Sequence, residues 1–531
     1  MFPSVSKHSL VLAGSTPLDR LLAAALSGMG LLVLATAAGL AGAAMLRRRC
    51  LHWSWALAPF PPALLLWPQL GRLAVPLTVA SLCGARSGRR RHRRDLECGA
   101  DIAQTAAERI GPRDALGALS GWMAVRRQRW FTADGLLLGR EQSGRAVRLP
   151  VGGPAGTHTL VVGATGSGKT VTQAWVALRC IERGVGVLVV DPKGDALLER
   201  VLRQAAGAAG RRYVGWSPEG PSSYNPFERG SETEIADKAL SAERFTEPHY
   251  LRQAQRYLGH EVRVLRATAV TVTLASLVAH LDPQVLEVAA RSLPATDAQE
   301  VFAYLDSLTA RQVRDLTGVR DRLAVLAESD AGRWLDAAAS GAPALDLAQA
   351  VQAGEVVHFR LDADRRPLLA QMLGAAIVAD LVTVVAGLQA RPQPSLVVID
   401  EFSAVAAEHV GRLFARARSA GMSLLLATQE CSDLRLPGRQ HLLEQVLGNV
   451  STVIAHRQGV PESAELICQV AGTRSGWAAA HRSDGGRTLT RVREYAIHPD
   501  EIKTLPTGWA AVLVTSADTS RRVSIARVLA P

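Results

Sequence analysis

TLVVGATGSGKT, running from Thr159 to Thr170, is the stretch of this 531-residue sequence that decides its fold. Its last eight residues fit the phosphate-binding pattern G-x-x-x-x-G-K-[ST] at every specified position. The apolar run at its start suits a buried strand, and VTQAWVALRCIERG after it has apolar residues at helical spacing. Unpaired backbone N–H groups converge where a strand, a glycine loop and a helix N-terminus meet, so such a turn binds anions. The sequence therefore predicts an α/β domain that binds a nucleotide.

The loop residues have separate expected roles. Lys169 is expected to reach the β- and γ-phosphates of ATP, and the hydroxyl of Thr170 to ligate Mg²⁺. A glycine-rich turn that fits by chance is the alternative, and the flanking strand and helix disfavour it. The residues expected to bind the nucleotide are Gly163, Ala164, Thr165, Gly166, Ser167, Gly168, Lys169 and Thr170.

A second motif, SLVVIDEF from Ser395 to Phe402, ends an apolar strand in two carboxylates. Asp400 is expected in the Mg²⁺ shell, and Glu401 is placed to polarise the water that attacks the γ-phosphate. The alternative is a solvent-facing strand end. A complete phosphate loop in the same chain favours the catalytic interpretation.

VGVLVVDPKGD, from Val185 to Asp195, is a further strand, and it carries Asp191 and Lys193 at its carboxyl end. Ligands gather at the carboxyl ends of strands in open parallel sheets, so Asp191 and Lys193 are also expected beside the nucleotide. A turn that caps the next helix explains these residues equally well.

MSLLLATQE, from Met422 to Glu430, predicts a strand that ends near Gln429, where a polar group can sense the γ-phosphate. An ordinary strand-end polar group is the alternative. The segment RLFARARSAG before it carries Arg412, Arg416 and Arg418. An arginine supplied by a neighbouring subunit stabilises a transferring phosphoryl group. A solvated basic helix face is at least as good an explanation for any one of the three.

The remaining body alternates between strand and helix signals. From Ser231 to about Ala339 strand signals vanish, so an all-helical insertion is expected there. A long apolar helix is expected over Pro367–Leu388 and a polar loop over Gly472–Thr490. The other expected elements are helix and linker over 96–130, a β-hairpin over Trp130–Pro150, and strands over Arg211–Pro218, Gly354–Asp362, Leu447–Gln458 and the final SIARVLA.

The N-terminal region predicts a membrane anchor. The uncharged run Leu21–Leu46 would be roughly 39 Å long as a helix, enough to cross a hydrocarbon core of about 30 Å. A proline-broken apolar stretch, Trp53–Gly84, is expected to hold a second span or an interfacial segment. A hairpin places the basic cluster Arg86–Arg94 in the cytoplasm but leaves Arg47–Arg49 outside. A single span with an outer N-terminus places both basic clusters in the cytoplasm. For Arg86–Arg94 a lipid-facing stop signal is favoured over a nucleic-acid site.

The overall composition indicates less about function than these motifs do. The formal net charge is +12, and only five of the 60 basic residues are lysines. Abundant arginine partly reflects genome composition, so a polyanionic partner needs clustered charge as further evidence. The six cysteines lie far apart without a C-x-x-C pair, which predicts reduced thiols and excludes a disulfide framework or a C-x-x-C zinc site.

These stretches, in this order, resemble the TraD/TraG-type coupling proteins of conjugative type IV secretion systems, within the FtsK/HerA class of P-loop ATPases. The resemblance covers about residues 130–531, and the DPKG element is its most discriminating part. It rests on GLLLGRE, HTLVVGATGSGKT, VVDPKGD, SYNPF, VVIDEF, ATQE and HPDEI…LPTGWA.

The resemblance implies a RecA-like P-loop NTPase with a mostly parallel central sheet, an all-α inserted domain and an N-terminal transmembrane segment or hairpin. The implied anchor covers residues 1–95, with a span at 21–46, an expected second span within 53–84 and a basic juxtamembrane segment at 86–94. A linker follows at 96–130. The motor domain covers 131–230 and 340–531, and the all-α domain lies between its two parts at 231–339.

The resemblance also implies a hexameric ring in the bacterial inner membrane, with its ATPase domain in the cytoplasm and ATP at subunit interfaces. Such a ring passes single-stranded DNA with its bound relaxase to the inner-membrane components of a secretion channel. Arg418 aligns with the arginine that acts in trans. The expected catalytic residues are then Glu401, Lys169, Gln429 and Arg418, with Thr170 and Asp400 at Mg²⁺.

Two other functions stay open. One is a secretion-assembly ATPase that energises channel building without moving DNA. The other is a membrane-bound receptor that uses ATP as a structural ligand. DNA-stimulated hydrolysis separates the first from a DNA motor, and the effect of replacing Glu401 separates the second.

Overall fold

The computed structural model describes residues 17–48, 52–61, 74–97, 112–153, 155–243, 245, 247–389, 391–405, 407–435, 441–481, 487–516 and 519–531. They form two compact units. One contains the described parts of 1–121, 143–145 and 474–494, and the other contains 122–142, 146–473 and 495–531. The second unit holds every residue expected at the nucleotide site.

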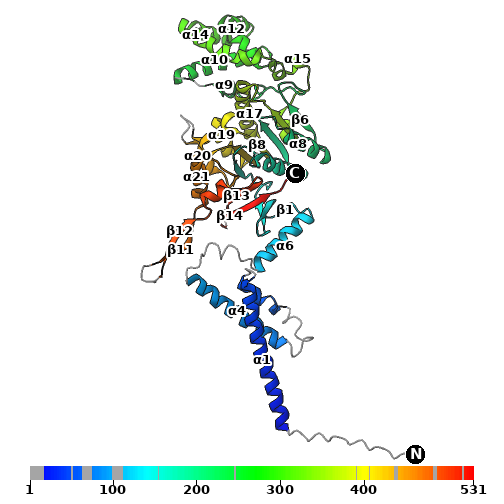
Figure 1. Ribbon diagram of the computed structural model, residues 1–531. Helices are drawn as coiled ribbons and strands as arrows, with labels where there is room; N and C mark the ends of the chain where they lie inside the picture. Colours follow the sequence, from blue (N-terminus) through cyan, green and yellow to red (C-terminus); the bar gives the residue numbers. More distant parts are fainter. Residues whose placement is uncertain are drawn as a thin grey trace, which may run out of the picture. The chain divides into compact units, whose positions relative to one another are not determined.

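A 12-stranded sheet forms the centre of the second unit (Figure 1). The strand order is β1-β2-β14-β13-β10-β4-β9-β8-β5-β7-β6, with β3 paired to β2. The seven strands from β10 to β6 run parallel, and the others join antiparallel. The strands are β1 (Phe131–Thr132), β2 (Gly135–Glu141), β3 (Ala146–Leu149), β4 (His158–Val162), β5 (Gly186–Asp191), β6 (Tyr213–Trp216), β7 (Val356–Arg360), β8 (Ser395–Ile399), β9 (Met422–Thr428), β10 (Thr452–Ala455), β13 (Trp509–Ser516) and β14 (Thr519–Val528). The expected mostly parallel α/β sheet is confirmed.

Both faces of the sheet are buried, which explains why its central strands are continuously apolar. In β4, Leu160 and Val162 pack into the core on one face, and Val161 packs into the core on the other. Helices α7 (Lys169–Glu182) and α8 (Ala196–Ala208) contribute to the core that holds Val161. The opposite core includes residues of α17 (Pro367–Leu388), α19 (Ala407–Ala417), α20 (Leu442–Asn449) and α21 (Pro461–Ala471). The short helices α18 (Phe402–Val405) and α22 (Pro499–Lys503) add Phe402 and Ile502 to it.

Helix α17 is, among the described residues, the one helix long and apolar enough to cross a membrane. However, 72% of its most apolar window is buried inside the protein. Its side chains pack under the sheet together with those of β8 and β9. It is therefore a core helix of the second unit, over the range in which the sequence predicts a long apolar helix.

Helices alone occupy the described residues between Ser231 and Ala339. They are α9 (Glu232–Ala239), α10 (Pro248–Ala267), α11 (Leu274–His280), α12 (Pro283–Ala290), α13 (Ala295–Asp306), α14 (Ala310–Ala327), the 3-10 turn η3 (Gly332–Leu335) and the start of α15 (Ala337–Ser340). Helix α16 (Leu347–Ala353) then leads back into β7. In Figure 1, α9 lies between α17 and the helices α10, α12 and α14.

A buried ion pair joins this helical segment to α17. The ammonium of Lys238 on α9 bonds a carboxylate oxygen of Asp380 at 2.6 Å, and both side chains are at most 4% exposed. Lys238 also donates to the carbonyls of Pro226 and Arg229 at 3.0 and 2.6 Å. The other oxygen of Asp380 accepts from the Tyr224 hydroxyl at 2.8 Å. All three ammonium protons and both carboxylate oxygens therefore have partners.

In the first unit, α1 (Pro17–Arg48) and α4 (Ala74–Glu97) pack through small residues. A Cβ on Gly39 would lie 2.3 Å from the carbonyl oxygen of Ala80, and one on Gly84 would lie 2.9 Å from that of Gly39. Close contact through small residues is typical of membrane helices. The predicted span Leu21–Leu46 lies within α1, whose Leu31, Leu34 and other large apolar side chains are exposed.

The second predicted span is only partly described. Trp53–Leu57 form a 3-10 turn, η1, and α4 begins at Ala74 and continues into the basic cluster. The prolines and Arg72 of the 62–73 stretch, Arg49, and the linker residues 98–111 lie outside the described residues. Helix α6 (Pro112–Arg126) follows the linker and precedes β1.

Two sequence expectations are wrong in detail. Gly472–Thr490, expected as a loop, contributes instead to a two-stranded ribbon of β11 (Thr473–His481) and β12 (Arg487–Tyr495). Glycine, serine and charged residues in this stretch obscure the period of a strand in the sequence, and Arg474 and Glu494 pair across the ribbon, 2.9 Å apart. The strand expected over Leu447–Gln458 is limited to Thr452–Ala455, because α20 extends to Asn449.

Candidate nucleotide site

The candidate site lies at the carboxyl ends of four adjacent parallel strands. In the sheet order, β4 is followed by β9, β8 and β5. The phosphate loop follows β4, Gln429 follows β9, Asp400 and Glu401 follow β8, and Lys193 follows β5. Neighbouring parallel strands end at the same edge, so motifs more than 200 residues apart in sequence meet there, as for Lys193 and Glu401.

The phosphate loop needs glycine at two close contacts. A Cβ on Gly163 would lie 2.6 Å from the Cβ of His456, and one on Gly168 would lie 3.3 Å from the Cα of Gly508. Gly168 also has φ 118°, a backbone conformation that L side chains avoid, and it begins helix α7. The ammonium of Lys169 donates to the carbonyl oxygen of Gly163. The loop is thus wrapped around its own lysine at the N-terminus of a helix.

Residues near the C-terminal end of the chain form hydrogen bonds to the phosphate loop and to the helix that follows it. His456, fully buried, bonds the hydroxyl of Thr172 at 2.9 Å through Nε2 and the carbonyl of Trp509 at 3.0 Å through Nδ1. The N–H of Gly508 donates to the carbonyl of Ser167 at 3.0 Å. The side-chain amide of Gln458 is oriented so that its nitrogen donates to Glu430 and its oxygen accepts from the N–H of Gly163 at 3.0 Å. Sequence reasoning missed all three residues, since none belongs to a nucleotide-binding motif.

Four charged side chains converge in front of the loop. The ammonium of Lys193 lies 2.7 Å from Oε1 of Glu401, and that of Lys169 lies 3.9 Å from the same oxygen. Burial lowers the pKa of Lys169, although Glu401 and Asp400 oppose this. Burial would also lower the pKa of Lys193, but its bond to Glu401 raises the pKa above the ordinary lysine value. Two ammonium groups therefore lie beside Glu401, and both are donors that a phosphate could use.

Asp400 lies deeper than Glu401 and bonds the helix that carries the loop. Its Oδ1 accepts from the side-chain amide of Gln173 at 2.8 Å. Burial raises the pKa of Asp400 to about 6, although the bond from Gln173 lowers it. Gln173 follows Lys169 by four positions on α7, so helical spacing is the signal that could have identified it.

Glu401 has an unusual backbone. Its φ is 41°, in the left-handed region that costs a non-glycine residue about 1–3 kcal/mol. Its side chain is 11% exposed. Such strain persists only when surrounding contacts enforce it, and it clusters at functional sites.

Asp191 is occupied by its own turn. Its Oδ1 accepts from the N–H groups of Lys193 and Gly194 at 2.9 Å each, and its Oδ2 from that of Asp195 at 2.7 Å. Burial would raise the pKa of Asp191, but the nearby His358 and the hydrogen bonds from these amides lower it. Asp195 then caps α8 by accepting from Leu197 and Leu198. The turn interpretation explains these contacts, and a direct contact of Asp191 with a nucleotide stays a prediction.

The last two expected site residues lie in different places. Gln429 reaches the phosphate loop, where its Oε1 accepts from the hydroxyl of Thr165 at 3.3 Å. Arg418 is exposed before the amino end of β9, where its carbonyl accepts from the N–H of Gly156 at 3.3 Å. It is at the opposite edge of the sheet, a strand length of roughly 15–20 Å away. The chain therefore does not bring Arg418 to its own site.

These residues fit ATP with Mg²⁺. Gly166 has open space around it, and the buried Ser167 hydroxyl and Gln173 Oε1 have no hydrogen-bond partner among the described residues. Thr170 and Asp400 supply the oxygen ligands that Mg²⁺ prefers, while the two lysines supply positive charge for phosphates.

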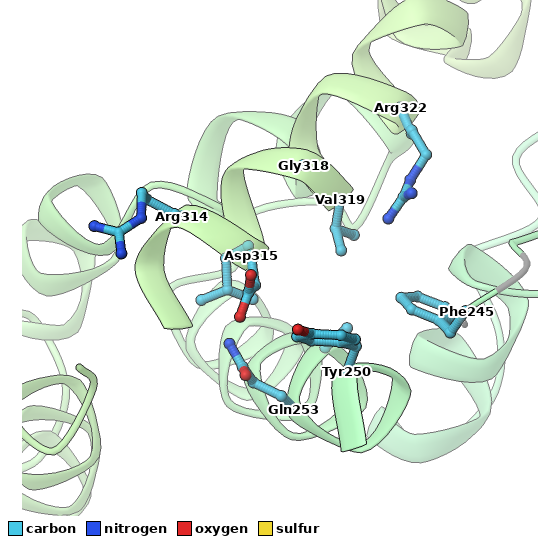
Figure 2. A pocket seen from close by; sticks show the side chains of 10 residues that line it. Phe245, Tyr250, Gln253, Arg314, Asp315, Gly318, Val319 and Arg322 are labelled. Atoms are coloured by element: carbon cyan, nitrogen blue, oxygen red, sulfur yellow. The ribbon is translucent and has the colours of Figure 1, made fainter. Parts of the chain in front are cut away.

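A separate cavity of about 300 Å³ lies in the helical segment, between α10 and α14 (Figure 2). Asp315 is directed toward Tyr250 and Gln253, while Arg314 points away. Arg322 at its other end bonds Glu243 at 2.8 Å. None of its lining residues lies at the strand ends, so this cavity is not part of the nucleotide site.

Two family models match parts of this chain. Residues 394–507 match the family model described as the TraM recognition site of TraD and TraG. Residues 137–204 match the HerA-like helicase C-terminal model. No curated protein matches the chain in sequence.

Solved structures share the fold. The bacterial conjugative coupling protein TrwB, lacking its first 70 residues, is 18% identical with a TM-score of 0.55, over 76% of this chain and 90% of that one. TrwB with ADP and Mg²⁺ is 18% identical with a TM-score of 0.52, over 77% and 92%. VirB4 of Thermoanaerobacter pseudethanolicus is 15% identical with a TM-score of 0.51, over 76% and 98%. The two family models confirm the resemblance to TraD and TraG and to the HerA class, and the solved structures confirm the fold.

Proposed function

We propose that this chain is a membrane-anchored ATPase that moves DNA, the coupling protein of a conjugative type IV secretion system. The observation that carries the proposal is the meeting of Lys169, Lys193, Asp400 and Glu401 at one sheet edge beside a complete phosphate loop. The TraD/TraG family match over residues 394–507 supports the conjugative role.

In this proposal each residue has a defined task. The loop N–H groups and Lys169 bind the phosphates, and Thr170 and Asp400 hold Mg²⁺, which neutralises charge on the transferring phosphoryl group. Glu401 orients a water and accepts its proton, and Gln429 senses the terminal phosphate through its place beside Thr165.

Arg418 suits a role between subunits. It is exposed at the edge opposite its own phosphate loop, so only a second copy of the chain can present it to that loop. We propose a ring of six such subunits, in which each Arg418 completes the neighbouring site. Asp191, in this proposal, acts by ordering the turn that presents Lys193.

The first unit supplies the anchor. Large apolar side chains are exposed along α1, and α4 packs against α1 before continuing into the basic cluster. We propose that the anchor lies in the bacterial inner membrane, with the sheet unit in the cytoplasm. The helices between β6 and β7 then form the all-α domain at 231–339 that faces the relaxase and its single-stranded DNA.

A secretion-assembly ATPase is the second candidate. The chain is about as similar in fold to VirB4 as to TrwB, with TM-scores of 0.51 and 0.55, so the fold does not separate the two functions.

The test is ATP hydrolysis by the full chain in lipid nanodiscs, with and without single-stranded DNA. Stimulation by DNA, together with DNA transfer in cells that is lost on Lys169→Ala, is expected of the coupling protein. A hydrolysis rate that DNA does not change indicates the assembly ATPase. DNA transfer that continues in Glu401→Gln contradicts a motor of either kind.

A further inference from the structure

Lys193 and Glu401 form a contact that neither motif explains alone. Lys193 follows β5 and Glu401 follows β8, and these two strands are neighbours in the sheet. The ammonium lies 2.7 Å from Oε1 of Glu401, the side chain expected to activate water. Lys193 is 40% exposed and Glu401 only 11%, so the lysine is the mobile member of the pair.

The backbone below Lys193 is fixed, whereas its side chain is free to change partner. Asp191 holds the N–H of Lys193 at 2.9 Å, and the carbonyl of Pro192 accepts from Ala363 at 2.6 Å. Among the residues that the structure describes, Glu401 is the one side-chain partner of the Lys193 ammonium. A long flexible chain on a rigid turn can therefore exchange one oxygen for another without moving the strand.

A nearby phosphate would compete for this lysine. Lys169, the lysine of the phosphate loop, lies 3.9 Å from the same oxygen of Glu401. A terminal phosphate bonded to Lys169 is thus within reach of Lys193. It carries more negative charge than a carboxylate and three acceptor oxygens, so it is the stronger partner for an ammonium.

We propose that Lys193 is the residue that distinguishes a bound nucleoside triphosphate from a diphosphate. Bonded to Glu401, it occupies the oxygen that would orient water. Bonded to the terminal phosphate, it releases that oxygen. The exchange makes Glu401 available only when there is a phosphate to transfer. This inference rests on the proposed ATPase function.

The experiment measures binding rather than turnover first. In the full chain in nanodiscs, with Mg²⁺, dissociation constants for ADP and for a non-hydrolysable ATP analogue are compared between wild type, Lys193→Met and Lys193→Arg. We expect Lys193→Met to weaken binding of the analogue by about 10- to 100-fold, the loss of one charged hydrogen bond, and that of ADP by less than about twofold. Lys193→Arg should restore most of the preference.

Lys503 is the matched control. It forms an ion pair of the same length, 2.7 Å to Asp500, with a similar exposure of 37%, on α22 outside the strand-end site. Lys503→Met should change neither constant, and thermal unfolding should show that every variant is folded. Equal weakening of ADP and analogue in Lys193→Met, or no change in either, overturns the inference. If the wild-type chain binds neither nucleotide, the proposed function fails as well.

Discussion

Lys193 and Lys238 each bond a carboxylate at nearly the same distance, 2.7 Å to Glu401 and 2.6 Å to Asp380, but their surroundings differ. Lys238 is 1% exposed and all of its protons have acceptors, including two backbone carbonyls. Lys193 is half-exposed and has one partner, which has a strained backbone and a second lysine nearby. The Lys238–Asp380 cluster, in which every donor and acceptor has a partner, joins the helical segment to α17 beneath the sheet. The ammonium of Lys193 in the Lys193–Glu401 cluster can still donate further hydrogen bonds, which is what a site that binds phosphate requires.

The largest expected difference between the clusters is in catalysis. Glu401→Gln should lower ATP turnover by about 100- to 10,000-fold, because the amide cannot accept the proton of the attacking water. Its melting temperature should stay close to that of the wild type. Steady-state hydrolysis and a thermal melt measure both. Glu199→Gln on α8, which removes a carboxylate paired with Arg203 of the same helix and Arg360 of β7, is the control for loss of an ion pair. Turnover within tenfold of wild type would contradict the assigned role.

The second test concerns stability. Lys238→Met should lower the free energy of unfolding by about 3–5 kcal/mol, since Asp380 is left buried without its cation. Urea denaturation of the full chain measures this. The double variant Lys238→Met with Asp380→Leu should recover part of the loss. A cost below about 1 kcal/mol for the single change would remove the contrast between the two clusters.

The third prediction is a pH dependence beneath the loop. Burial lowers the pKa of His456 from 6.5 to about 4, although the carbonyl of Trp509 opposes this. Between these values the unfolded chain binds a proton that the folded chain does not. The free energy of unfolding should therefore fall as pH falls from about 6.5 toward 4, by at most about 3 kcal/mol from this group. Denaturation at both pH values checks it. His456→Asn should show a smaller fall, whereas the exposed His249→Asn should not differ from wild type.

The smallest effect concerns the backbone of Glu401. Glycine adopts φ 41° freely, so Glu401→Gly should be more stable than Glu401→Ala by about 1 kcal/mol. Both variants lose the side chain, and the comparison therefore isolates strain. At Glu199, inside α8, the same pair should show the opposite order, because glycine weakens a helix by about 1 kcal/mol relative to alanine. Melting curves of the four variants decide it, and equal stability at position 401 argues against stored strain.

The sequence predicts the parts of the site that are continuous in the chain. The phosphate loop, Asp400 and Glu401 each end an apolar strand, and the rule that parallel strands end at one edge then brings them together. It cannot predict contacts across large separations between residues of ordinary type. His456 and Thr172 are 284 positions apart, and nothing about either residue indicates the bond. The pairing of Lys193 with Glu401 required the strand order, because only adjacency of β5 and β8 makes it possible.

The ribbon β11–β12 illustrates the opposite failure. Its segment contains glycine, serine and many charges, which predict a loop when considered alone. Two such strands pair because each supplies the other's hydrogen bonds, a property of the pair rather than of either sequence. Composition therefore misled the prediction where local pairing, and not burial, determines the structure.

The contact between Gly508 and the phosphate loop links nucleotide binding to the way the chain is made. Ser167 leaves the ribosome long before Gly508, and at about 5–20 residues per second the loop remains without its final support for tens of seconds. Strands β13 and β14 complete that support, and β14 pairs with β2 from the beginning of the same unit. We expect ribosome-bound chains of increasing length to acquire affinity for a fluorescent nucleotide only after these last strands have emerged. Nucleotide binding would then begin only when synthesis of the chain is nearly complete.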